Sequence, residues 1–174
     1  FEQVHLAPRD KRLCTRLVYL TLENLNRLDF ALSRLLQDPL ALEPRVRNLL
    51  RLSAAQIMLL DRVPDSAAVD EAVKLTRAMG LEDLTGLVNG VLRNLIRTQA
   101  DIPWPTPQDG LRYYNIMFSQ PEWFARMVLD EYGEQEGGRI LSYEHTDHRL
   151  TLRPNLGRIS PEKFRELLAK KEWQ

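Results

Sequence analysis

Apolar side chains recur at every third or fourth position along most of the first hundred residues. This is the spacing of one face of an α-helix, and no stretch in this region alternates apolar and polar residues as a strand does. Prolines and a glycine interrupt the pattern at Pro39, Pro44, Pro64 and Gly80, and each suits a helix end or a first helical turn. The sequence therefore predicts a bundle of about five helices between Asp10 and Gln99. The residues that carry the spacing are Leu13, Leu17, Leu20, Leu28, Leu32, Leu35, Leu36, Leu49, Leu50, Ile57 and Leu60.

A proline-rich segment follows this helical region. Pro103, Pro105 and Pro107 occupy alternate positions, a pattern that disfavours regular structure and predicts a stiff connector over residues 101–110. We place a domain boundary there. An all-helical domain is expected over residues 1–100, and the start of a second domain over residues 111–174.

The second region mixes two kinds of pattern. Ser119-Gln-Pro-Glu122 has the residues of a capped helix start, Gly133 suits the end of that helix, and a short helix is expected over residues 134–143. Residues 149–154 alternate polar and apolar and predict a strand, and residues 160–168 predict another helix. Since one strand does not make a sheet, we expect a mainly α chain that ends in a small, incomplete α+β segment.

The chain has a single cysteine, Cys14, which excludes an internal disulfide and a site with two cysteine ligands. Its apolar helical neighbours predict that it is buried as a small apolar side chain. No apolar run reaches the ~18 residues of a spanning helix, and the first residues lack the pattern of an export signal. We therefore expect a cytoplasmic protein with no membrane partner.

Formal charge is balanced, with 24 basic and 24 acidic residues, so the total argues neither for nor against a nucleic-acid partner. The arginines are arranged less evenly. Pairs separated by four residues occur three times, and like charges so placed repel each other in a helix, which suggests an anionic partner. The alternative is that these arginines form solvated faces or pair with Asp10, Asp38, Glu43 and Asp83. The pairs are Arg12 with Arg16, Arg47 with Arg51, and Arg93 with Arg97, and Arg45 joins the middle pair near a helix start.

The segment Gly86-Leu-Val-Asn-Gly-Val-Leu-Arg-Asn-Leu-Ile-Arg97 divides into two halves on a helical wheel. One half is apolar and the other displays glycine, amide and guanidinium groups. Asn89 lies on the polar half, where it either meets RNA or caps a neighbouring loop. The candidate RNA-binding residues of the whole chain are Arg12, Arg16, Arg45, Arg47, Arg51, Asn89, Arg93 and Arg97.

This segment, together with Arg62-Val-Pro-Asp-Ser-Ala-Ala-Val-Asp-Glu-Ala-Val73 and Leu52-Ser-Ala-Ala-Gln-Ile-Met-Leu-Leu60, resembles the NusB-like domain that opens the RsmB (Sun/Fmu) family of small-subunit ribosomal RNA cytosine-C5 methyltransferases. The resemblance covers about residues 7–168. It departs from the family at Ala55, Ser66 and Pro154, and the family's first, basic helix has no counterpart.

In that family a NusB-like domain and a linking domain precede a domain that binds S-adenosylmethionine and methylates RNA. Methyl transfer to cytosine needs a reactive thiolate and a glycine-rich turn for the cofactor, and the sequence supplies neither. We therefore expect no catalytic, cofactor-binding or metal-binding residues in this chain. His145 and His148 lack a third ligand nearby. The resemblance implies S-adenosylmethionine for the full-length protein, and small-subunit ribosomal RNA and a missing C-terminal methyltransferase domain as partners.

The resulting functional hypothesis is an RNA-binding region that positions ribosomal RNA for a catalytic domain and is inactive alone. The alternative is a transcription antitermination or protein-interaction module of the NusB type. An unrelated helical adaptor, with no affinity for RNA, is the third possibility.

Overall fold

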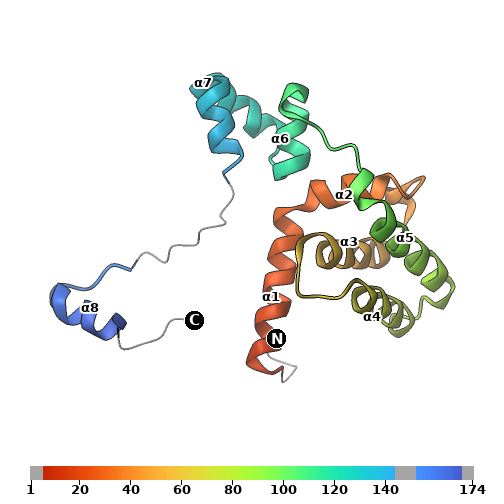
Figure 1. Cartoon of the computed structure of the whole chain (residues 1–174), viewed down its shortest axis with the longest axis horizontal. Helices are drawn as coiled ribbons and strands as arrows, with labels where there is room; N and C mark the ends of the chain where they lie inside the picture. The colour runs from red at the N-terminus through yellow and green to blue at the C-terminus, as the bar shows by residue number, and fades with distance from the viewer. Residues whose placement is uncertain (1–5, 144–151, 170–174) are drawn as a thin grey trace. The chain divides into compact units, whose positions relative to one another are not determined.

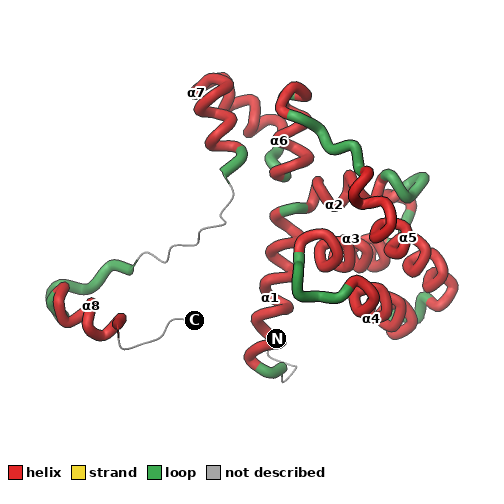
Figure 2. Tube along the Cα trace, in the orientation of Figure 1, coloured by secondary structure: helices red, strands yellow, loops and turns green. Residues whose placement is uncertain are grey.

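The structure is a computed structural model that describes residues 6–143 and 152–169. The described residues form helices and loops without strands, which confirms the mainly α fold class (Figures 1 and 2). They fall into two compact units, one up to Tyr143 and one beyond it.

Five helices build most of the first unit: α1 (Pro8–Glu23), α2 (Leu25–Ser33), α3 (Pro44–Leu59), α4 (Asp65–Ala78) and α5 (Thr85–Thr98). Their ends follow the predicted interruptions. Pro44 lies in the first turn of α3, where the carboxylate of Glu43 accepts a hydrogen bond from the backbone N–H of Val46 at 3.1 Å. Gly80 follows α4 with a φ of 72°, a backbone conformation that favours glycine. Short 3-10 helices occur at Pro39–Ala41, Glu82–Leu84 and Gln99–Asp101.

The core of the bundle surrounds α3, which packs against α1, α2, α4 and α5. Leu50, Ala54 and Ala55 of this helix are fully buried. The remaining buried apolar residues come from α2, α4 and α5, and they include Leu28, Ala31, Leu32, Ala68, Val69, Ala72, Val88, Val91, Leu92 and Leu95. Four of the five helices thus bury an apolar face, as the spacing predicts.

The helix α1 departs from that prediction. Leu13, Val18, Tyr19 and Leu22 are all exposed, with Tyr19 at 61%. Cys14, which we expected to be buried, is half-buried. Leu17 packs against the core and Thr21 is buried, so only the face that carries these two residues meets α3.

The predicted connector leads into two further helices of the same unit, α6 (Leu111–Phe118) and α7 (Glu122–Leu141). The sequence analysis did not predict α6. It did single out Gly133 as a helix end and Ser119 as a helix cap, and only the first of these predictions is confirmed. Gly133 interrupts α7 with φ 74° and ψ 171°, as predicted, whereas Ser119 does not cap this helix.

Ser119 instead ends α6 in the left-handed conformation, with a φ of 52°. Its Oγ accepts a hydrogen bond from the backbone N–H of Asn26 in α2 at 3.1 Å. The N-cap residue of α7 is Pro121, which makes no side-chain cap hydrogen bond, so the predicted capping box is wrong. The physical reason is that the serine hydroxyl is used in a contact between two distant helices.

Other contacts join α6 and the connector before it to α2. The side-chain amide of Asn26 donates to the carbonyl of Asn115 at 3.2 Å. The rings of Phe30 and Trp104 lie 5.5 Å apart, and the guanidinium of Arg27 lies 5.4 Å from the Trp104 ring centroid.

The described part of the second unit contains α8 (Pro161–Ala169), where the hydroxyl of Ser160 accepts from the backbone N–H of Lys163 at 3.3 Å. This confirms the predicted helix start. Of the strand predicted over residues 149–154, residues 149–151 lie outside the described part, and residues 152–154 adopt no regular structure. Among the described residues, no helix is long and apolar enough to cross a membrane.

Candidate nucleic-acid interface

The polar half of α5 presents its amides and guanidinium groups in hydrogen-bonded pairs. The Nε of Arg93 donates to Oδ1 of Asn89 at 2.8 Å, and Nη2 of Arg97 donates to Oδ1 of Asn94 at 2.8 Å. Both pairs are local, because residues three or four positions apart are neighbours on a helix. The structure thus groups three of the predicted residues, Asn89, Arg93 and Arg97, on one face.

The opposite face of α5 holds this arrangement in place. Val88, Val91, Leu92 and Leu95 are buried in the bundle core. Leu87 lies at the edge and is 36% exposed. Because the apolar half is fixed against α4 and α3, the polar half must point outward.

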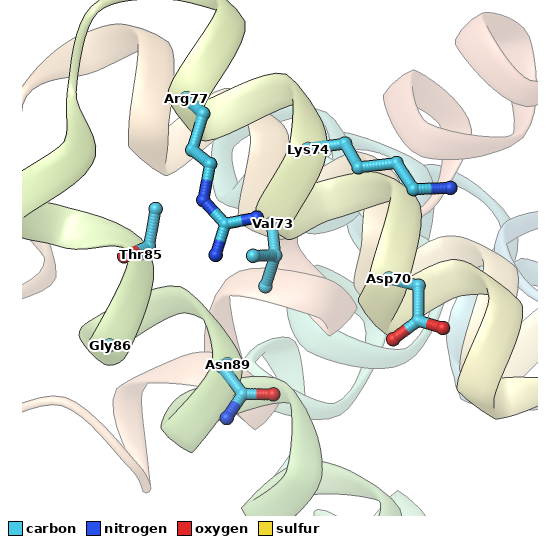
Figure 3. A pocket seen from close by; sticks show the side chains of 7 residues that line it. All are labelled: Asp70, Val73, Lys74, Arg77, Thr85, Gly86 and Asn89. Atoms are coloured by element: carbon cyan, nitrogen blue, oxygen red, sulfur yellow. The ribbon is translucent and has the colours of Figure 1, made fainter.

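A groove of about 460 Å³ separates the outer surfaces of α4 and α5 (Figure 3). The guanidinium of Arg77 reaches from α4 toward Thr85 and Asn89 of α5, and the carboxylate of Asp70 lies farther along α4. The ammonium group of Lys74 extends away from Arg77 in this view. The groove is lined by Asp70, Val73, Lys74, Arg77, Thr85, Gly86 and Asn89.

A second groove, of about 340 Å³, lies toward the start of α4. Arg93 and Ile96 line it from α5, and Asp65, Ser66 and Val69 line it from α4. The two predicted residues Asn89 and Arg93 therefore line neighbouring hollows on the same pair of helices. Both grooves thus lie between α4 and α5.

The two cations of α4 differ in their surroundings. Lys74 Nζ lies 2.7 Å from Oε1 of Glu71, and this hydrogen bond raises the pKa of Lys74 above its ordinary value of 10.5. The side chain of Arg77 makes no hydrogen bond or ion pair with any described residue, so its guanidinium is available to a ligand. Sequence reasoning missed both residues. Their spacing of three on a helix next to the predicted one was the signal that could have found them.

The other predicted arginines lie apart from this face in the fold and serve different contacts. Arg51 bonds both oxygens of Asp29 at 2.6 Å, and Arg45 Nε bonds Glu43 at 2.7 Å. The Arg45 hydrogen bond lowers the pKa of Glu43 below its ordinary value of 4.5. Of the acidic partners considered from the sequence, Glu43 is thus found, whereas Asp29 was not foreseen.

Arg47 is half-buried, and its Nε atom is buried without a hydrogen-bond partner among the described residues. Arg12 and Arg16 are exposed on α1 and form no ion pair within the described part of the chain. Of the eight predicted residues, therefore, three line the α5 face, two are paired with carboxylates, and three lie elsewhere on α1 and α3.

The described residues contain no group of three or more histidine, cysteine, aspartate or glutamate side chains that suits a metal ion. His145 and His148 lie outside the described residues. The α4–α5 face combines hydrogen-bond donors and cations, which bind anions and carbonyl groups, with the carboxylates of Asp65 and Asp70, which accept hydrogen bonds.

Comparison with known proteins gives two findings. Residues 1–97 match the model of the NusB family. Over 151 residues the chain is 34% identical to the probable ribosomal RNA small subunit methyltransferase B of Bacillus subtilis, covering 86% of this chain and 33% of that protein.

Two further relatives carry similar names. The probable ribosomal RNA small subunit methyltransferase B of Synechocystis is 32% identical, with 86% of this chain and 34% of the relative covered. The ribosomal RNA small subunit methyltransferase B of Pasteurella multocida is 30% identical, with 83% and 31% covered. The chain thus spans 31–34% of the length of these three relatives.

Proposed function

The chain belongs to the NusB family and corresponds to an N-terminal region of the RsmB (Sun) family, and from this we propose that its helical bundle binds small-subunit ribosomal RNA for a methyltransferase. In this proposal the bundle positions the RNA, and methyl transfer to cytosine from S-adenosylmethionine takes place in a catalytic domain outside this chain. The names of the relatives support small-subunit ribosomal RNA as the substrate and methyl transfer as the reaction. Such a role belongs in the bacterial cytoplasm, where ribosomes are made.

The observation that carries the proposal is the α4–α5 face. It combines guanidinium groups of Arg77, Arg93 and Arg97 with the amide of Asn89 beside a groove. Guanidinium groups bind phosphate oxygens through paired N–H donors, and amides bind base edges. Although the chain is neutral as a whole, this local set of donors is suited to an RNA backbone.

A second candidate function rests on α1. Val18, Tyr19 and Leu22 lie within about 100° of one another around this helix and leave apolar side chains exposed there, and such surfaces are typical of contacts with other proteins. This favours the protein-interaction alternative for α1. The two functions use different helices, so variants of α1 and α5 separate them.

Charge reversal on α5 tests the RNA proposal. We expect Arg93→Glu with Arg97→Glu to weaken binding to a small-subunit ribosomal RNA fragment, measured over a series of salt concentrations. Each lost phosphate contact should flatten the plot of log affinity against log salt by about 0.7 for single-stranded RNA. Two lost contacts therefore flatten it by about 1.4.

The matched control is Arg126→Glu with Arg139→Glu on α7, which makes the same change in net charge. Both arginines are exposed. This control should leave most of the affinity intact. Unchanged binding by the α5 variant, or an equal loss in the control, contradicts the proposal. Circular dichroism of both variants checks that the helices are retained.

A further inference from the structure

The groove between α4 and α5 carries opposite charges at its two ends (Figure 3). Asp70 and Arg77 both line it from α4, and they are seven residues apart in the sequence. At 1.5 Å per residue this places their Cα atoms about 10 Å apart along the helix axis. A ligand that fills the groove therefore meets a cation at one end and a carboxylate at the other.

Both charged groups keep hydrogen-bonding capacity for a ligand. Neither the Asp70 carboxylate nor the Arg77 guanidinium makes a hydrogen bond or ion pair in the described part of the chain, although the Asp70 charge helps to raise the pKa of Lys74, which also lines the groove. Across the groove, Oδ1 of Asn89 accepts from Arg93, which leaves the Nδ2 hydrogens of that amide as donors. The groove thus offers donors from Arg77 and Asn89 and an acceptor from Asp70.

A carboxylate repels the phosphates of a nucleic acid. A carboxylate that lines a groove for RNA therefore contributes to binding only if the RNA offers it a hydrogen-bond donor. Inside an RNA strand the 3′ and 5′ oxygens of the ribose are esterified, and the 2′-hydroxyl is the sugar's remaining hydrogen-bond donor. DNA lacks this hydroxyl, and proteins use it to tell the two nucleic acids apart.

We propose that this groove binds one nucleotide of an RNA strand and recognises its 2′-hydroxyl. Arg77 binds the phosphate, Asn89 donates to an oxygen of the same nucleotide, and the Asp70 carboxylate accepts the hydrogen bond of the 2′-hydroxyl. The inference rests on the proposed function, because it assumes that the α4–α5 face is the one that meets RNA. It adds a basis for selecting RNA over DNA.

Gly86 is one of the residues that line the groove. It lies in the first turn of α5, and a Cβ atom placed on it would meet no other atom within 4 Å. The helix backbone therefore tolerates a side chain here, which would project into the space that the ligand needs. A larger residue at this position blocks the groove without disturbing the core.

The first test compares three probes of one sequence: the small-subunit ribosomal RNA fragment, its 2′-O-methyl counterpart and its DNA counterpart. The wild-type chain should bind the RNA more tightly than the other two. Asp70→Ala should lower this preference by about tenfold, the effect of one hydrogen bond to a charged group. It should not weaken binding to DNA, because the substitution removes a negative charge.

The matched control is Asp130→Ala. It removes the same charge from an exposed position on α7, outside the groove. We expect it to change the affinities for all three probes by the same factor. A loss of preference in this control equal to that of Asp70→Ala contradicts a direct contact.

A second pair of variants tests whether the ligand occupies the groove at Gly86. Gly86→Leu should weaken RNA binding and bring the affinities for RNA and DNA closer together, whereas Gly86→Ala should have a small effect. Circular dichroism and urea unfolding establish that both variants fold.

The outcomes separate this inference from the proposed function. If the wild-type chain binds none of the probes, the proposed function fails. If it binds RNA through α5 without preferring RNA to the 2′-O-methyl strand, the proposed function stands and the 2′-hydroxyl contact is wrong. The same conclusion follows if Asp70→Ala and Gly86→Leu leave the preference unchanged.

Discussion

Arg51 holds α3 to α2 through both oxygens of one carboxylate. Its Nε donates to Oδ1 of Asp29 and its Nη2 to Oδ2, each at 2.6 Å, while Nη1 donates to Asn48 at 3.0 Å. The Arg51 side chain is 17% exposed and that of Asp29 is 40% exposed. Paired hydrogen bonds between planar groups at this depth are stronger than those of a surface ion pair.

Removing the carboxylate should therefore destabilise the bundle. We expect Asp29→Ala to lower the free energy of unfolding by about 1–2 kcal/mol, because the Arg51 guanidinium loses its two carboxylate acceptors while remaining largely buried and keeps only that of Asn48. Urea unfolding measures the change. Glu71→Ala, which removes the exposed partner of Lys74, should cost less than about 0.5 kcal/mol. Equal losses in the two variants would show that the Arg51 pair contributes no more than a surface contact.

The sequence predicted contacts between side chains close in the chain better than contacts between side chains far apart in it. Asn89 and Arg93 are four residues apart, so a helix alone brings them together. Asp29 and Arg51 are 22 residues apart and meet only because α2 packs on α3. Local spacing therefore identified the polar face of α5, but it did not show that Arg51 is used inside the fold.

At the scale of helices, Gly133 divides α7 into two parts. Its φ of 74° and ψ of 171° fall in a region that only glycine enters without strain. Beyond it, Gly137 is buried, and a Cβ atom there would lie 3.0 Å from the carbonyl oxygen of Val128. The break thus lets the second part of α7 turn back and pack closely against the first.

We expect Gly133→Ala to lower the free energy of unfolding by about 1–3 kcal/mol, since alanine is strained in this conformation. Gly90→Ala on α5 is the control, because Gly90 is helical and a Cβ atom there meets nothing within 4 Å. It should raise the free energy of unfolding by about 0.5–1 kcal/mol. Thermal unfolding of both variants checks that the two changes in stability have opposite signs. A Gly133→Ala chain more stable than the wild type would mean that the break in α7 is not needed for the fold.

The sequence analysis found helix ends that a single residue determines. It missed those that depend on tertiary contacts. Gly133 ends a helix by its own backbone freedom, and the sequence analysis found it. Ser119 has the chemistry of a helix cap, yet its hydroxyl binds the backbone of Asn26. α6 is only eight residues long and has no side-chain cap at its start, so its sequence carried little local signal.

At the scale of the whole first unit, the proline-rich connector is held against the bundle. The Trp104 ring contacts two residues of α2: its centroid lies 5.5 Å from that of Phe30 and 5.4 Å from the guanidinium of Arg27. Arg112 of α6 lies 5.9 Å from the Phe30 ring. The division into domains at residues 101–110 stays a prediction, but these contacts show how the connector is tied to α2.

Trp104 could serve RNA by stacking on a base or serve the fold by joining the connector to α2, and its substitution tells the two apart. Its ring already contacts Phe30 and Arg27 and is half-buried, so we expect Trp104→Ala to lower the free energy of unfolding by about 2 kcal/mol. Proteolysis near residues 101–110 should become faster, because the connector loses its anchor. Under conditions where the variant is folded, its RNA affinity should stay within about twofold of the wild type. Stacking on a base is worth about 1–3 kcal/mol, and we do not expect Trp104 to stack on one.

Trp123→Ala is the control, as this ring is 70% exposed on α7 and its removal should change stability little. A Trp104→Ala chain with unchanged stability and weakened RNA binding would assign this ring to the RNA instead.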